Sequence, residues 1–293
     1  MLVGSAYALP ACQRAITKTE VLRALVDQVV VPNTAAVAEN SRRLVGEIAH
    51  LSGDPTAVTL HAAREQWQRA LLSWKRADAF RSGPIMARNS LMRVMFWPVR
   101  TAAIDALLEG SPTIDDASIA ALGVDRRGLF ALEHLLYSAS DELMVAAFVG
   151  PAGERRARLA RALASNVALD AEQLVRALGD GKAFADKLAD GGQDSLNQLI
   201  GQLVHTVENV SASRLTRISG LAKSGRLQAT EIEGGSSRMS QQIALTYLRA
   251  SERLFLGVER GLSDLVRALS SAVDDRVRAA FRQAIAAVAG LGL

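Results

Sequence analysis

Apolar residues recur at intervals of three, four or seven along most of the chain, and this spacing constrains the fold more than any other feature. Within residues 58–80 the repeat is carried by Leu60, Trp67, Leu71 and Trp74. Such spacing places side chains on one face of an α-helix, because a helix turns once in about 3.6 residues. Glycine and proline clusters separate the repeats. The pattern predicts an all-α protein built from amphipathic helices.

Composition agrees with this prediction and excludes several classes of protein. The 293 residues are 49% hydrophobic but only 4% aromatic, which is typical of helices packed on helices. The 34 basic and 30 acidic side chains leave a net charge of +4, so most charges can pair on neighbouring helical turns, and no nucleic-acid partner is indicated. The only cysteine, Cys12, excludes an internal disulfide and a zinc site made of several thiolates.

The repeats predict long helices and two modules. We expect Pro32 to kink or break the first helix. The glycine and proline residues at 150–153 favour a boundary, which divides the chain into a first helical bundle at 17–150 and a second at 151–293. The longer helices are expected at 17–51, 58–80, 126–148, 155–178, 184–223, 239–269 and 274–289.

Residues 1–16 are interpreted as the remnant of an export signal or as a flexible N-terminus. The first eleven residues are apolar or small and lead to Cys12, which resembles a lipoprotein cleavage box, although the stretch is short and has no basic start. We therefore expect a periplasmic or cell-envelope protein, with a lipid anchor at Cys12 as one alternative. No other run of about 18 uncharged apolar residues is present, so we expect no transmembrane segment in the mature protein.

Familiar catalytic and metal-binding motifs are absent from the sequence. We find no phosphate-binding glycine loop, no paired His-Glu zinc helix and no nucleophile elbow. The four histidines are dispersed, without a second histidine at ligand spacing on a helix: His50, His61, His134 and His205. The sequence does not predict a preformed site of several histidines.

Three stretches, in order, resemble motifs of the imelysin family. Residues 74–84, WKRADAFRSGP, are similar to a helix that ends in Phe-Arg-x-Gly-Pro, and the Trp-Pro pair at 97–98 follows as in that family. Residues 128–137, GLFALEHLLY, resemble the family's Gly-x-His-x-x-Glu helix. Residues 231–240, EIEGGSSRMS, resemble its serine-bearing loop before a helix. The resemblance spans nearly the whole chain, with these stretches in the family's order.

The resemblance implies two up-and-down helical bundles with a functional cleft between them, in envelope proteins linked to iron regulation or uptake. This chain departs from the family at one position, where Phe130 replaces the histidine of the His-x-x-Glu pair and Glu133 remains. His134 follows Glu133 directly and is rotated by about 100° around the helix, so these two cannot easily hold one ion. We assign no metal ligand, and iron or another divalent metal stays open as a cofactor.

We favour a non-catalytic binding protein whose cleft takes a small polar ligand or an iron-related species. One alternative is a metal-dependent or Glu-dependent peptidase-like hydrolase in which Glu133 is the general base. Another is a helical scaffold for envelope protein partners, recognisable by a large exposed apolar patch. The residues expected to line the cleft are Asp78, Arg81, Trp97, Glu133, Ser237 and Ser240.

The same residues have structural interpretations that stay open at this point. Glu133 on an apolar helix is expected to need a partner, such as Arg81, because burying an unpaired acid is costly. Ser237 and Ser240 are favoured as caps of the helix that follows them. His134 is favoured as a core or boundary residue with a hydrogen-bond partner, and the three tryptophans as core residues.

Overall fold

The computed structural model describes residues 16–110, 113–215 and 232–291. The predicted all-α class is confirmed, because this part of the chain contains helices and connecting loops and no strand. The proposed signal remnant, including Cys12, lies outside the described residues. The longer helices are α1 (Lys18–Leu25), α2 (Val31–Gly53), α3 (Ala57–Asp78), α10 (Gly150–Leu178), α12 (Gly192–Asn209), α14 (Ser240–Leu256) and α16 (Ser271–Ala289).

Shorter helices connect and cover the long ones. Between α3 and α10 the chain forms α4 (Gly83–Ala87), α5 (Ser90–Met95), α6 (Thr101–Glu109), α7 (Asp116–Ala120), α8 (Leu129–Tyr137) and α9 (Asp141–Ala146). A 3-10 turn at Val124–Arg126 precedes α8. The later short helices are α11 (Lys182–Asp190) and α15 (Leu262–Leu269).

The first helical stretch continues through Pro32 by changing its hydrogen-bond pattern. A π-helical turn, Val26–Val30, joins α1 to α2, and Pro32 occupies the first turn of α2. Proline has no N–H to donate, so a wider turn just before it lets the helix proceed without an unmet bond. The stretch is long and apolar enough to cross a membrane by length and composition, yet half of its most apolar window is buried. The core helix of a soluble protein passes the same test, so the length and hydropathy of this stretch are weak evidence for a membrane span.

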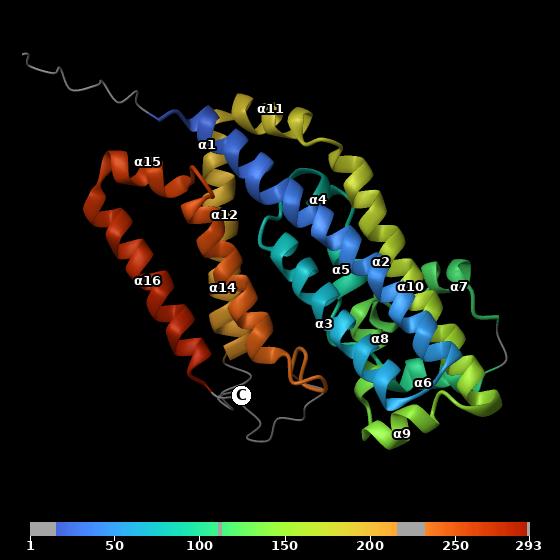
Figure 1. The fold of residues 1–293 in the computed structure, drawn as a ribbon. Helices are drawn as coiled ribbons and strands as arrows, with labels where there is room; N and C mark the ends of the chain where they lie inside the picture. Colours follow the sequence, from blue (N-terminus) through green and yellow to red (C-terminus); the bar gives the residue numbers. More distant parts are fainter. Residues whose placement is uncertain (1–15, 111–112, 216–231, 292–293) are drawn as a thin grey trace, which may run out of the picture.

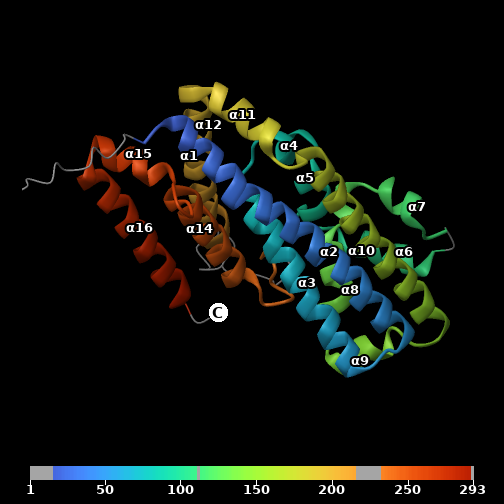
Figure 2. The same ribbon diagram turned by 45° about the horizontal axis from the view of Figure 1, so that its top comes forward.

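The helices form two groups that meet along α3 and α14 (Figure 1). In the first group α2 packs against α3 and α10, and α8 packs against α3 and α10. In the second group α14 packs against α12, α15 and α16. The view in Figure 2 keeps α15 and α16 on the side of the molecule opposite to α7 and α9. The junction between the groups is where the functional site was expected.

The boundary at residue 150 stays a prediction. The helix that begins there, α10, packs mainly on α2, so it lies with helices that precede it in sequence. The chain then passes through α11 to α12, and both of these contact α1. Helix α1 therefore joins its sequence neighbours to the second group.

Two predicted helices are interrupted at glycines. The stretch 184–223 is divided between α11 and α12 at Gly191 and Gly192, and 239–269 is divided at Gly257. Gly257 has a φ of 71°, and a Cβ there would lie 1.8 Å from the carbonyl oxygen of Arg260. The turn between α14 and α15 requires glycine because a side chain would collide with backbone.

Candidate functional site

A cavity of about 470 Å³ lies at the junction of the two helix groups, and we call it the junction cavity. Its walls come from the end of α3, from α4 and α5, from α12 and from the start of α14. Four of the six predicted site residues line it: Asp78, Arg81, Trp97 and Ser240. The remaining lining is largely apolar, with Ile85, Met86, Leu91, Met92, Met95 and Phe96 on one side.

The end of α3 supplies the charged floor of the junction cavity. Asp78 is 3% exposed, and Arg81 reaches back over it with Nε 2.6 Å from Oδ1 and Nη2 3.2 Å from Oδ2. Tyr247 on α14 donates its hydroxyl to Asp78 Oδ2. The carboxylate is therefore held from both helix groups, and a forked contact of this kind fixes its orientation.

Lys75 and Glu233 form a buried ion pair beside Asp78. Lys75 Nζ lies 2.5 Å from Glu233 Oε1, and the two side chains are 2% and 10% exposed. The same ammonium lies 5.1 Å from the ring centre of Phe130 and 5.6 Å from that of Tyr247. Aromatic faces attract cations, so the rings help to stabilise a charge that burial disfavours.

Sequence reasoning missed Lys75, Glu233 and Tyr247 as site residues. For Lys75 a signal was present, because it lies four residues after Leu71 on the apolar face of α3. A lysine on such a face needs a partner from elsewhere in the fold. For Glu233 and Tyr247 the sequence offers no such signal, since their partners are more than 150 residues away.

Helix α8 brings Glu133 to the junction. The first residue of α8 follows Gly128, which has a φ of 82°. A Cβ added at Gly128 would lie 2.4 Å from the carbonyl oxygen of Val94. Only glycine permits this approach of α8 to the end of α5. Trp67, buried in α3, donates its indole N–H to the carbonyl of Leu129 at 2.8 Å. These two contacts set the position of the helix that carries Glu133.

Glu133 is 6% exposed and accepts two hydrogen bonds from Ser237. The backbone N–H of Ser237 lies 3.0 Å, and its hydroxyl 2.6 Å, from Glu133 Oε1. Burial raises the pKa of Glu133 to about 6, against the lowering effect of the Ser237 hydrogen bonds. The nearby Glu233 also raises this pKa, and Lys75 lowers it. The expected pairing of Glu133 with Arg81 is wrong, because Arg81 pairs with Asp78.

A smaller cavity of about 200 Å³, which we call the Glu133 cavity, gives access to this carboxyl group. Trp97 is half-buried and lines both cavities, and its peptide bond to Pro98 is cis. Trp67 and Trp74 are fully buried core residues, as expected. The Glu133 cavity is lined by Trp97, Val99, Thr101, Phe130, Glu133, His134, Ile232 and Ser236.

Neither Ser237, which precedes α14, nor Ser240, its first residue, caps this helix. The N-cap of α14 is Met239, and no side chain there accepts a cap hydrogen bond. Ser237 instead binds Glu133, and Ser240 donates its hydroxyl to the carbonyl of Glu233 at 2.8 Å. The favoured capping interpretation is therefore wrong. Ser237 holds the loop that carries Glu233 against α8, and Ser240 ties the same loop to the start of α14.

Phe130 and His134 are the two residues of α8 on which the expected loss of a metal site rests. Phe130 lies one turn before Glu133 and is 1% exposed. His134 Nε2 is 2.7 Å from Asp105 Oδ1, which agrees with the boundary interpretation of that histidine. Within residues 16–110, 113–215 and 232–291 no group of three or more His, Cys, Asp or Glu side chains is arranged to hold a metal ion.

Comparison with known proteins places these features in a family. The family model described as Imelysin matches residues 30–292 of the chain. In sequence the chain is similar to "Iron-regulated protein A" of Synechococcus elongatus, with 28% identity over 140 residues. That alignment covers 47% of this chain and 37% of the relative, so it spans well under half of that protein.

Two solved structures share the fold. A putative iron-regulated protein A precursor from Parabacteroides distasonis superposes with a TM-score of 0.78 at 15% identity, covering 97% of this chain and 89% of that one. An imelysin-like protein from Psychrobacter arcticum 273-4 gives a TM-score of 0.68 at 19% identity, covering 93% and 84%. At these identities the likeness shows the arrangement of helices alone.

Proposed function

Because this chain belongs to the imelysin family, we propose that it is an iron-related protein of the cell envelope that binds a small ligand without catalysis. The junction cavity is the observation that carries the proposal. A volume of about 470 Å³ is in the range of small-molecule sites, which are mostly apolar with a few well-placed polar groups. The link to iron is taken from the relatives named iron-regulated protein A. The envelope location rests on the resemblance of the first residues to an export signal.

The lining supports a ligand with one polar end and an apolar body. Asp78, Arg81 and the pair of Lys75 with Glu233 place both signs of charge at the floor of the cavity. Met86, Met92 and Met95 with other apolar residues form the facing wall. Methionine side chains adapt to irregular shapes, so this wall suits an apolar group of variable outline.

The described side chains do not suit a bare metal ion held by the protein. Asp78 already contacts Arg81 and Tyr247, and Glu233 contacts Lys75, so each acid has cationic or hydroxyl partners at short distance. A metal ion would have to displace these contacts. The proposal therefore takes a small polar molecule, or iron carried within such a molecule, as the ligand.

Binding is tested by thermal unfolding of the purified protein against a small-molecule library that includes iron-chelating compounds. A ligand of the junction cavity raises the unfolding temperature, and Met92→Trp abolishes the rise by filling the cavity. Met92 is 52% exposed, so the larger side chain is tolerated in the fold. The control is Leu143→Trp, which is 63% exposed on α9 and lies outside both cavities. No stabilising compound, or equal effects of both variants, contradicts the proposal.

Metal content is measured in parallel on the purified parent and on Phe130→His. The proposal expects no stoichiometric metal in the parent. The variant restores an imidazole one turn before Glu133, so gain of metal by the variant supports the interpretation that Phe130 replaces a ligand. Stoichiometric metal in the parent contradicts it.

A hydrolase is the second candidate, and the pKa of Glu133 favours it. A carboxyl group with a pKa of about 6 beside an accessible cavity has the basicity that a general base needs near neutral pH. This candidate predicts peptide cleavage that is lost in Glu133→Gln. An inactive parent protein, assayed on a broad set of peptides, removes it.

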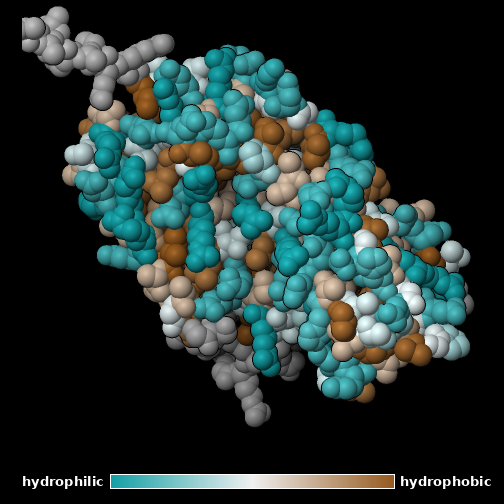
Figure 3. Space-filling view, viewed as in Figure 1, coloured by the Kyte–Doolittle hydropathy of each residue, from teal (hydrophilic) through white to brown (hydrophobic). Residues whose placement is uncertain are grey.

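The third candidate is a scaffold for envelope proteins, and the face of the molecule shown in Figure 3 does not favour it. Hydrophobic residues there occur in separate groups among hydrophilic ones. A partner-binding face is expected to present a larger continuous apolar patch. Capture of an envelope protein by the purified chain, abolished by charge substitution at Ile200 and Val204 on α12, would support the scaffold.

A further inference from the structure

A third cavity, of about 450 Å³, lies on the other side of α5 from the junction cavity. Leu91, Met92 and Met95 of α5 face the junction cavity, whereas Arg93 faces this one. Helix α10 contributes Asn166, Asp170 and Gln173, whose spacing of four and three places them on one face. Three arginines line the space, and we call it the arginine cavity: Arg88, Arg93 and Arg127.

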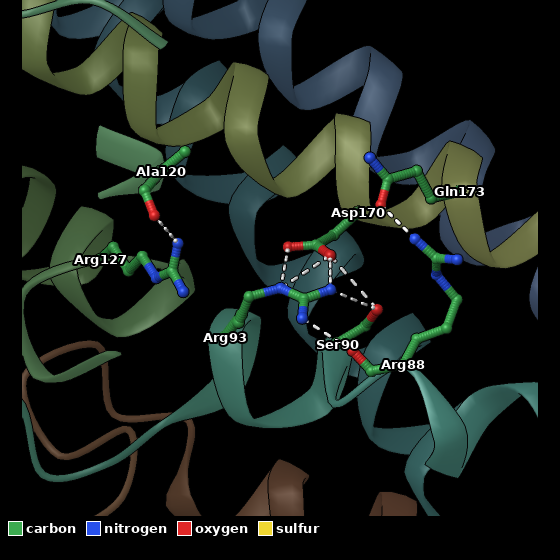
Figure 4. A network of polar contacts seen from close by, with 7 residues as sticks. All are labelled: Arg88, Ser90, Arg93, Ala120, Arg127, Asp170 and Gln173. Atoms are coloured by element: carbon green, nitrogen blue, oxygen red, sulfur yellow. Dashed lines mark hydrogen bonds and ion pairs between the residues drawn. The ribbon is translucent and has the colours of Figure 1, made fainter. Parts of the chain in front are cut away.

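Among the residues that the structure describes, Asp170 is the only acid that lines the arginine cavity, and it pairs with Arg93. Arg93 Nε lies 3.1 and 3.2 Å from the two carboxylate oxygens, and Nη2 also contacts Oδ1 (Figure 4). Ser90 donates its hydroxyl to the same carboxylate at 3.2 Å. The third nitrogen of this guanidinium, Nη1, donates to the carbonyl of Arg88 at 2.7 Å. One positive charge is thus balanced by one negative charge.

Arg127 and Arg88 have no such partner among the residues that the structure describes. Arg127 is 8% exposed, and its Nη1 donates to the carbonyl of Ala120 at 2.8 Å. Arg88 donates from Nη2 to the side-chain oxygen of Gln173. The Nε atoms of both arginines are buried without a hydrogen-bond partner within the described part of the chain. Figure 4 shows the two guanidinium groups on either side of Arg93.

The three guanidinium groups and one carboxylate leave two positive charges around the arginine cavity. Burial lowers the pKa of Arg127, and Asp170 raises it, but an arginine stays charged at neutral pH in any case. A buried charge without a counter-charge is costly. Its neutral partners, a carbonyl and an amide, do not remove this cost.

We propose that the arginine cavity binds a small dianion, and that the arginines contact carboxylate or phosphate oxygens of this ligand. Two negative charges balance the excess of the lining, and guanidinium groups contact carboxylate and phosphate oxygens in a forked, two-point geometry. Both oxygen types share this chemistry, so the identity of the anion is decided by experiment. The inference does not depend on the proposed function, since the junction cavity lies across α5 and has a separate lining.

Isothermal titration of the purified full chain with inorganic phosphate and, separately, with the dicarboxylate succinate tests the proposal at constant ionic strength. Saturable binding of one anion per chain is expected for at least one probe, and the stronger probe identifies the oxygen type. Arg88→Gln is expected to weaken Kd about tenfold or more, because it removes a charge-assisted contact. Arg127→Lys keeps the charge but loses the fork, so it is expected to weaken binding as well.

The matched control is Arg158→Gln, which removes one positive charge from an exposed position on α10 that pairs with Glu154. It is expected to leave Kd unchanged. Absence of saturable binding by both probes overturns the proposal, and so do equal effects of Arg88→Gln and Arg158→Gln, which would indicate net charge alone. Loss of binding in Met92→Trp also overturns it, by placing the anion in the junction cavity. If Arg127→Lys fails to fold, the Kd of Arg88→Gln tests the proposal, because Arg88 is only half-buried.

Discussion

At the scale of single residues, Glu133 shows how burial and hydrogen bonding oppose each other. Ser237 donates two hydrogen bonds to its carboxylate, which favours the charged form, but burial outweighs them and raises the pKa to about 6. Compared with a solvent-exposed glutamate, Glu133 is therefore shifted toward the protonated form, although the carboxylate predominates above about pH 6. The raised pKa follows from the position of Glu133 in the protein interior, away from bulk water.

The raised pKa of Glu133 predicts a pH dependence of stability. The folded value is above the ordinary 4.5, so its stabilising contribution is complete below about pH 4.5 and is lost as the pH rises through about 6. The free energy of unfolding is expected to fall by about 2 kcal/mol over this window. Urea unfolding measured between about pH 4 and about 7.5 gives this free energy at each pH, and the fall should be absent in Glu133→Gln. Glu154→Gln, at an exposed position, serves as control, and an unchanged profile in Glu133→Gln refutes the prediction.

At the scale of elements, two glycines decide how helices meet. Gly128 lets α8 approach the backbone of α5, and Gly257 lets the chain turn between α14 and α15. The glycines that interrupt α11 and α12 were visible in the sequence only as weak signals, because a glycine inside a helical repeat is often tolerated. Whether a helix breaks there depends on what packs against it.

Gly128→Ala is expected to destabilise the protein by about 2 kcal/mol or more. The added Cβ meets the carbonyl of Val94 at 2.4 Å, and the positive φ disfavours any side chain. The control is Gly46→Ala on α2, where a Cβ meets nothing within 4 Å. There the substitution should raise the free energy of unfolding by about 0.5–1 kcal/mol, because alanine favours the helix. Chemical denaturation measures both, and similar effects of the two variants would refute the argument.

At the scale of the whole molecule, contacts between residues far apart in sequence join the two helix groups. Lys75 reaches Glu233 across 158 residues, and Asp78 reaches Tyr247 across 169. Both bonds connect α3 to α14 or to the loop before it, at the floor of the junction cavity. Stability of this junction and shape of the cavity therefore depend on the same side chains.

A double-mutant cycle on Lys75→Met and Glu233→Gln is expected to give a coupling energy of about 1–3 kcal/mol, because both side chains are buried. The control cycle uses Arg69 and Glu65, an exposed pair on the same helix with 62% and 67% exposure. Its coupling should stay below about 0.5 kcal/mol. Equal coupling in the two cycles would contradict the assigned role of the buried pair.

The sequence by itself determined the all-α class, the position of α3, the core role of Trp67 and Trp74 and the family, because these follow from local periodicity and from short motifs. Only the tertiary structure decided the partner of Glu133, the ion pair of Lys75, the packing of α10 on α2 and the break at Gly257. The physical reason is range. A helix repeat acts over a few residues, whereas the charge balance of a buried group depends on side chains that the chain brings together only when the helices pack.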